Sequence, residues 1–147
     1  MAKILVADDD PISLLFTKSL LEDRGYTVVT AEDGEKTLVS LRKELPDLLV
    51  TDLVMPYRNG LEIIQEMKND PQLAAIPVLV MSMKDREPDI VQGLEAGADD
   101  YVVKPVHALE LAARVKKILE RRAAGGPGSA GPGAGRPGGG TPGGRKP

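Results

Sequence analysis

The chain has 147 residues, 41% of them hydrophobic and only 3% aromatic, which favours a single domain with an aliphatic core. It contains no cysteine, which excludes disulfides, thiolate metal sites and cysteine catalysis, and it has no apolar stretch of membrane-spanning length and no signal peptide. We therefore expect a cytoplasmic protein. Its net charge of −3 argues against nucleic-acid binding, which needs a clustered basic footprint.

Strand-like apolar runs alternate with helix-like segments through most of the chain. The runs predict strands at 3–7, 26–30, 48–53, 76–81 and 101–104. The segments between them predict helices at 11–24, 34–44, 61–68, 88–96 and 108–122. Strict alternation of this kind is typical of a three-layer α/β domain, in which helices cover both faces of a parallel sheet.

The first predicted helix has a recognisable beginning. Asp10 is placed to cap it, and Pro11 occupies the first helical position, where a missing N–H costs nothing. We expect its apolar face to be formed by Ile12, Leu15, Phe16 and Leu20.

The composition changes abruptly after Arg122. Residues 123–147 contain glycine, proline, alanine and a few polar residues, with no leucine, isoleucine, valine or aromatic residue. Such a segment cannot bury enough apolar surface to offset the entropy lost on ordering. We therefore predict a folded domain at 1–122 and a disordered basic tail or linker at 123–147. Because this tail is basic, nucleic-acid binding by the tail stays an alternative, although a weakly supported one.

Four of the predicted strands end in polar groups. Asp8, Asp9 and Asp10 follow the first strand, Asp52 lies near the end of the third, Ser82 follows the fourth and Lys104 ends the fifth. In an open parallel sheet these ends meet at one edge, where ligands bind. Carboxylates, a hydroxyl and an ammonium gathered there suit Mg²⁺ and a phosphoryl group.

Three segments then carry a family resemblance. The sequences at 4–11, 46–56 and 97–105, in that order and at these separations, resemble the receiver domain of bacterial two-component response regulators. The resemblance covers nearly all of 1–122. It implies a flavodoxin-like (βα)5 fold with strand order 2-1-3-4-5, and a signalling role in a phosphorelay.

The resemblance also implies roles for the polar residues. Asp52 would accept a phosphoryl group from a sensor histidine kinase or phosphotransfer protein, using Mg²⁺ as cofactor. Asp9 would bind the metal directly and Asp8 directly or through water, together with Asp52 and the backbone carbonyl of Val54. Lys104 would pair with the carboxylate and then with a phosphoryl oxygen.

The resemblance also implies which residues transmit the phosphorylation of Asp52 to the surface. Ser82 would bond the phosphoryl group and move toward it, so that the ring of Tyr101 turns inward. The surface formed by the last two helices and the strand between them would then change its contacts with a downstream protein. The Lys104–Pro105 peptide bond is expected to be cis, as in the family.

Three residues that flank the site are expected to tune its rate. Met83 stands where receivers commonly have a small residue, and its long side chain predicts slow formation or decay of the aspartyl phosphate. Val54 offers no polar side chain to hold an attacking water, which favours the same outcome. The charge of Lys84 could either attract a phosphatase or shield the phosphoryl group.

Other functions stay open at the level of sequence. The leading interpretation is a phosphoaccepting switch that catalyses only its own phosphorylation and dephosphorylation, and is not otherwise an enzyme. A second is a localisation or scaffold protein whose tail recruits partners while the domain acts as a gate. A third, an Mg²⁺-dependent phosphohydrolase, lacks the second carboxylate expected close after Asp52. The chain could also be the front of a longer protein.

Overall fold

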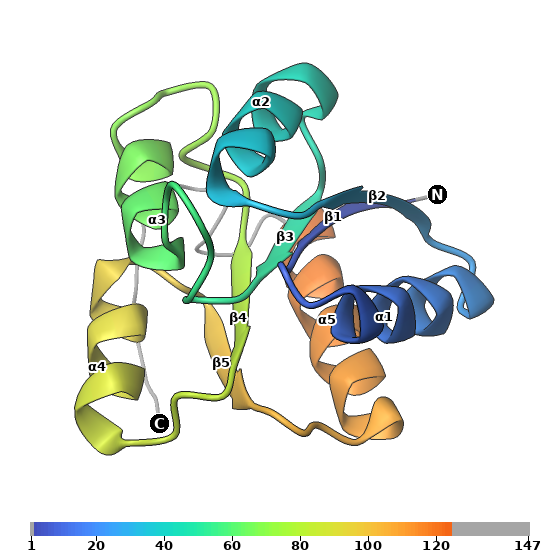
Figure 1. Cartoon of the computed structure of the whole chain (residues 1–147). Coiled ribbons are helices and arrows are strands. Elements are labelled where there is room, and N and C mark those ends of the chain that lie inside the picture. Colours follow the sequence, from blue (N-terminus) through green and yellow to red (C-terminus); the bar gives the residue numbers. More distant parts are fainter. Residues whose placement is uncertain (1, 125–147) are drawn as a thin grey trace.

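A computed structural model describes residues 2–124, in which five strands alternate with five helices (Figure 1). The strands are β1 (Lys3–Ala7), β2 (Thr27–Ala31), β3 (Leu48–Thr51), β4 (Val78–Ser82) and β5 (Asp100–Val103). The helices are α1 (Pro11–Asp23), α2 (Gly34–Glu44), α3 (Gly60–Lys68), α4 (Glu87–Ala96) and α5 (Ala108–Ala123). Nearly all of the predicted tail, from 125 onward, lies outside the described residues.

The strands form one parallel sheet in the order β2-β1-β3-β4-β5, as predicted. Helices α1 and α5 cover one face, and α2, α3 and α4 cover the other (Figure 1). The core accordingly divides into two apolar clusters, one on each side of the sheet. No helix within residues 2–124 is both long and apolar enough to cross a membrane.

The helix beginnings follow from local capping chemistry. Asp10 caps α1 as predicted, because its Oδ1 accepts a hydrogen bond from the backbone N–H of Ile12 at 3.0 Å. At the start of α3, Asn59 and Glu62 satisfy each other's backbone N–H groups in a capping box. These caps fix where the chain leaves the carboxyl edge of the sheet after β1 and after β3.

The apolar face predicted for α1 is wrong except at Leu20, which is partly buried and packs against the core. The structure buries Thr17 and Leu21, and leaves Ile12, Leu15 and Phe16 at 80%, 63% and 46% exposure. The helix carries aliphatic residues on more than one side, so spacing alone does not choose the face that packs. Packing against β1, β2 and α5 makes that choice. In α5, Leu109 is likewise exposed, although its spacing would place it with the apolar residues that pack.

The loop after β3 is held against α2. The predicted strand at 48–53 ends at Thr51, because the backbone turns away and Gly60 N–H donates to the carbonyl of Leu53 at 2.8 Å. Gly34 N–H donates to the carbonyl of Pro56 at 3.1 Å, and a Cβ on Gly34 would overlap with Arg58. The segment that follows the third strand is thereby fixed in place.

Candidate functional site

Asp52 lies at the centre of the carboxyl edge of the sheet. It is the first residue beyond β3, and its N–H donates to the carbonyl of Ala7 at 3.0 Å, so it is anchored beside the end of β1. The residue is 9% exposed. Oδ1 accepts from the N–H of Val54 at 3.2 Å, and Oδ2 accepts from Lys104 Nζ at 2.9 Å. One carboxylate is therefore both oriented and within reach of solvent.

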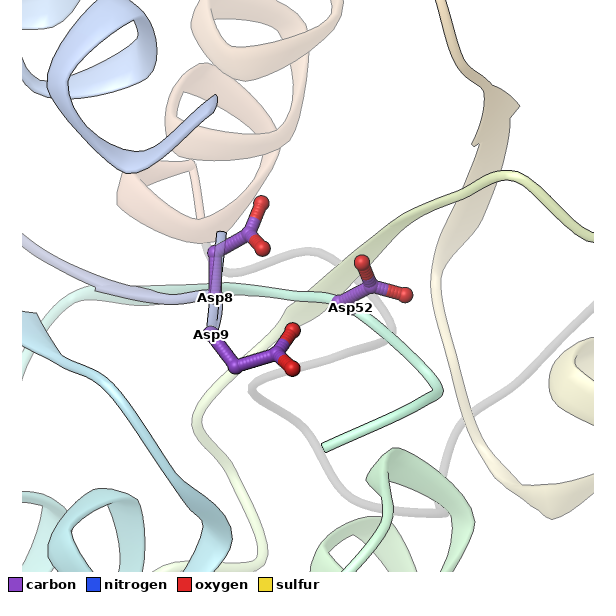
Figure 2. A group of neighbouring side chains, drawn as sticks. All are labelled: Asp8, Asp9 and Asp52. Carbon is purple, nitrogen blue, oxygen red and sulfur yellow. The ribbon is translucent and has the colours of Figure 1, made fainter. Parts of the chain in front are cut away.

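The two carboxylates after β1 differ sharply in their surroundings. Asp8 is 1% exposed, and its Oδ1 accepts from the N–H of Asp10 at 3.0 Å, whereas Asp9 is exposed. Carboxylate oxygens of Asp8, Asp9 and Asp52 all lie within 4.8 Å of one another. Figure 2 shows the three side chains at the adjacent ends of β1 and β3. Such a group of oxygen donors suits a hard divalent cation.

Lys104 joins the two buried carboxylates. Its Nζ donates to Asp8 Oδ2 at 2.7 Å and to Asp52 Oδ2 at 2.9 Å. Burial disfavours the ammonium, but these hydrogen bonds outweigh burial and raise the pKa of Lys104 above its ordinary value. Its peptide bond to Pro105 is cis, as expected. Against three carboxylates the site carries this one ammonium, which leaves an excess of negative charge for a cation to neutralise.

Ser82 ends β4 at the same edge. Its side chain is fully buried, and its Oγ accepts from the N–H of Lys84 at 3.1 Å. A hydroxyl that accepts in this way can still donate its own proton. Met83 and Lys84 follow it, and both are exposed, Met83 at 72%. Val54, on the loop after β3, is 55% exposed, so the three residues expected to tune the site lie at its open side.

Tyr101 lies inside the domain. The residue is 8% exposed, and its hydroxyl donates to the carbonyl of Lys84 at 2.7 Å. Burial raises the pKa of its phenol. The inward position that we expected after movement of Ser82 is the one the structure contains.

Sequence reasoning missed two backbone contributions to the site. The N–H of Asp10 orients Asp8, in addition to the capping role of the Asp10 side chain. Gly60 lies so close to Asp52 that a Cβ on it would approach the Asp52 carbonyl oxygen to 2.5 Å. The Asn59-Gly60 pair signals a turn, but only the folded chain reveals which backbone the glycine approaches.

Comparison with known proteins identifies the domain that carries this geometry. Residues 4–116 match the response regulator receiver domain family. The chain belongs to this family. The receiver architecture predicted from three sequence segments is thereby confirmed, as is the flavodoxin-like strand order. Receiver domains are signalling domains of two-component systems, not classical enzymes, and the acidic pocket of this one could bind Mg²⁺.

The relatives of this receiver include both longer and similarly short proteins. It is 42% identical over 127 residues to the alkaline phosphatase synthesis transcriptional regulatory protein PhoP of Bacillus subtilis, a match that spans 86% of this chain and 52% of PhoP. It is 37% identical over 119 residues to the protein PilH of Pseudomonas aeruginosa, which spans 81% of this chain and 98% of PilH. The chain thus covers about half of PhoP and nearly all of PilH.

A solved structure agrees with the fold. A Francisella response regulator receiver domain superposes with a TM-score of 0.78 at 33% identity, covering 83% of this chain and 99% of that domain.

We expect Lys104→Met to lower the free energy of unfolding by about 3 kcal/mol at neutral pH, because it leaves the carboxylates of Asp8 and Asp52 without their counter-charge. The raised pKa of Lys104 means that this contribution is present below the unfolded pKa and is lost as pH rises through the folded pKa. The difference from wild type therefore narrows above about pH 10.4. Urea unfolding of both proteins between pH 7 and 11 measures this difference in the free energy of unfolding.

Lys84→Met is the matched control, since Lys84 is a nearby lysine that is exposed. Adding Asp52→Asn to Lys104→Met should recover part of the loss, because only one buried carboxylate is then left unpaired. Equal stabilities of the two single lysine variants at pH 7 would contradict the role assigned to Lys104.

Proposed function

We propose that Asp52 accepts a phosphoryl group from a phosphohistidine on a sensor histidine kinase or phosphotransfer protein, in a reaction that needs Mg²⁺. The observation that carries the proposal is the setting of the Asp52 carboxylate. It lies at the open carboxyl edge of the sheet, 2.9 Å from the Lys104 ammonium, with Asp8 and Asp9 beside it. An oriented carboxylate with a cation at hand is a competent nucleophile for an acyl phosphate.

The step exchanges one bond for another at phosphorus. A carboxylate oxygen of Asp52 attacks the phosphorus, and the bond from phosphorus to the histidine nitrogen breaks. The electron pair of that bond stays on the imidazole nitrogen, which then takes up a proton. Lys104 follows the negative charge from the carboxylate to a phosphoryl oxygen, and the buried hydroxyl of Ser82 donates to another.

The residues present fit a magnesium ion. Asp8, Asp9 and Asp52 offer carboxylate oxygens within 4.8 Å of one another, and the exposure of Asp9 leaves a route for the ion from solvent. These three side chains and the backbone carbonyl of Val54 would hold the metal. When bound, Mg²⁺ supplies positive charge that offsets the charge developing on the phosphoryl oxygens.

An apolar groove beside the site supports docking of the phosphodonor protein there. The groove has a volume of about 470 Å³ and borders Lys104. Its apolar lining comes from Ile12, Phe16, Met81, Met83, Pro105 and Val106. A donor protein must bring its phosphohistidine to Asp52, and the exposed apolar side chains of this groove, such as Ile12 and Met83, provide contact area next to the acceptor.

We further propose that the surface of α4, β5 and α5 carries the output to a downstream protein. On α4, Val91 and Leu94 are 43% and 42% exposed. Tyr101 of β5 links this surface to the phosphoacceptor side through its hydrogen bond to the carbonyl of Lys84. A packing change at Ser82 would therefore reach the α4 surface through contacting residues.

Incubation with Mg²⁺ and acetyl phosphate should add one phosphoryl group to the wild-type chain and none to Asp52→Asn, because only the Asp52 carboxylate is positioned as nucleophile. Intact mass spectrometry measures the adduct. Asp10→Asn is the matched control, since asparagine preserves the helix cap, and it should be phosphorylated like wild type. An adduct on Asp52→Asn, or none on wild type, would sink the proposal.

Mg²⁺ should raise the melting temperature of the wild type, by an amount equivalent to about 2.7 kcal/mol at a concentration one hundred times Kd. Asp9→Asn should abolish this rise. In EDTA the same variant should be more stable than wild type, by up to about 1 kcal/mol, because it removes a like charge from the acidic group. Thermal melts with and without Mg²⁺ measure both effects. An unchanged response to Mg²⁺ in Asp9→Asn would show that Asp9 is not a ligand.

Met83→Ala should shorten the lifetime of the aspartyl phosphate roughly threefold, equivalent to less than 1 kcal/mol of barrier, because the long side chain restricts water at the open side of the site. Loss of the phosphoryl group is followed by mass after removal of the donor. Leu109→Ala, which trims another exposed apolar side chain, should leave the lifetime unaltered. Equal decay in Met83→Ala and wild type would remove the idea.

A further inference from the structure

The ring of Tyr101 packs close to the backbone of Gly93 in α4. A Cβ built on Gly93 would lie 3.1 Å from Cδ2 and 3.2 Å from Cε2 of the ring, closer than the ordinary van der Waals range of 3.4–4 Å. At the tip of the ring, the tyrosine hydroxyl donates to the Lys84 carbonyl at 2.7 Å. The ring is thus held between the backbone of α4 and the loop that follows Ser82.

The helix itself gives no reason for glycine at this position. Gly93 lies inside α4, where glycine is less favourable than alanine because it orders a freer backbone. Gly97, by contrast, ends the same helix with a positive φ of 127°, a conformation that favours glycine. Gly93 shows no such conformation. Space for the tyrosine ring is what the missing Cβ at Gly93 provides.

We propose that Gly93 is a positioning residue for Tyr101. The bare backbone at Gly93 forms the seat of the ring, so that the position of the ring and the position of α4 are coupled. The link runs from the Ser82 hydroxyl to the peptide of Lys84, to the Tyr101 hydroxyl, and through the ring to Gly93. The use of this link in signalling rests on the proposed function, because phosphorylation of Asp52 would favour the inward position of the ring over an outward one.

The contact between Gly93 and Tyr101 affects the exposed apolar side chains of α4. Val91 and Leu94 flank Gly93 and are exposed. Withdrawal of the ring from its seat would free α4 to move relative to β5 and would change how these two side chains are presented. Through its contact with the ring, Gly93 therefore influences how the α4 surface is arranged when a partner protein binds.

The experiment uses Tyr101 as its own reporter. The chain has no tryptophan and only three tyrosines, so Tyr26→Phe with Tyr57→Phe leaves Tyr101 as the single source of tyrosine fluorescence. In this full-length background, Gly93→Ala should raise the acrylamide quenching constant of Tyr101, because the added Cβ is too close to the ring and displaces it toward solvent. Glu95→Ala, at an exposed position on the same helix, should leave quenching unchanged.

A second measurement separates the ring contact from a general effect on the helix. With Tyr101 present, Gly93→Ala should lower the melting temperature, because the contact with the ring outweighs the better helix propensity of alanine. In a Tyr101→Leu background the same change should raise the melting temperature, because no ring is there to be displaced. The proposal would be overturned if Gly93→Ala left the quenching of Tyr101 unchanged. It would also be overturned if Gly93→Ala raised the melting temperature both with Tyr101 and with leucine at position 101.

Phosphorylation gives an independent control. Gly93→Ala leaves every residue that contacts Asp52 in place, so acetyl phosphate should still modify Asp52 in this variant. Failure of the wild type to take up a phosphoryl group would refute the proposed function without affecting the quenching result. Unchanged quenching in a variant that is phosphorylated normally would refute the role of Gly93 alone.

Discussion

One ammonium group, that of Lys104, joins the ends of three strands. Lys104 follows β5 at the edge of the sheet, yet its Nζ reaches past the end of β4 to Asp52 after β3 and to Asp8 after β1. A long flexible side chain with a point charge can bridge this distance and contact both carboxylates at once. Without it, two nearly buried carboxylates would lie beside each other uncompensated. The geometry of the whole carboxyl edge depends on this pair of contacts.

The charges at the carboxyl edge of the sheet do not cancel. Three carboxylates face one ammonium, so the folded chain retains repulsion that a more stable sequence would remove. Functional sites commonly carry such a local cost while the surrounding fold supports it. Here the support is the central part of the sheet, where β1 and β3 are buried throughout apart from Lys3. The excess charge is what makes a divalent cation a fitting ligand.

The phosphoacceptor residue lies between two surfaces of different character. On the α1 side, mainly apolar residues line an open groove next to Lys104. On the α4 side, the loop after β4 is joined to the helix through Tyr101 and Gly93. Under the function proposed above, a donor protein would approach from the first surface and a downstream partner would read the second. Asp52 connects them because its strand, β3, lies in the middle of the sheet.

Much of the fold was predictable from local chemistry. The alternation of apolar runs and helical segments predicted the element order, and capping chemistry located Asp10 at the start of the first helix. The resemblance to receivers supplied the strand order. The polar strand ends predicted which side chains would meet, because parallel strands bring their carboxyl ends to one edge. Apart from the strand order, these predictions rest on neighbours in sequence or on the regular geometry of a parallel sheet.

Only the tertiary structure determined which of several chemically similar residues are buried and which are exposed. The sequence cannot tell which side of α1 packs, because apolar residues lie on several sides of it, and contact with the sheet and α5 buries Leu21 and exposes Leu15. Asp8 and Asp9 are chemically identical, yet the end of β1 buries the first and exposes the second. Gly93 acquires its meaning from Tyr101, a residue on another element. Burial and contact are properties of neighbours in space, which no local pattern specifies.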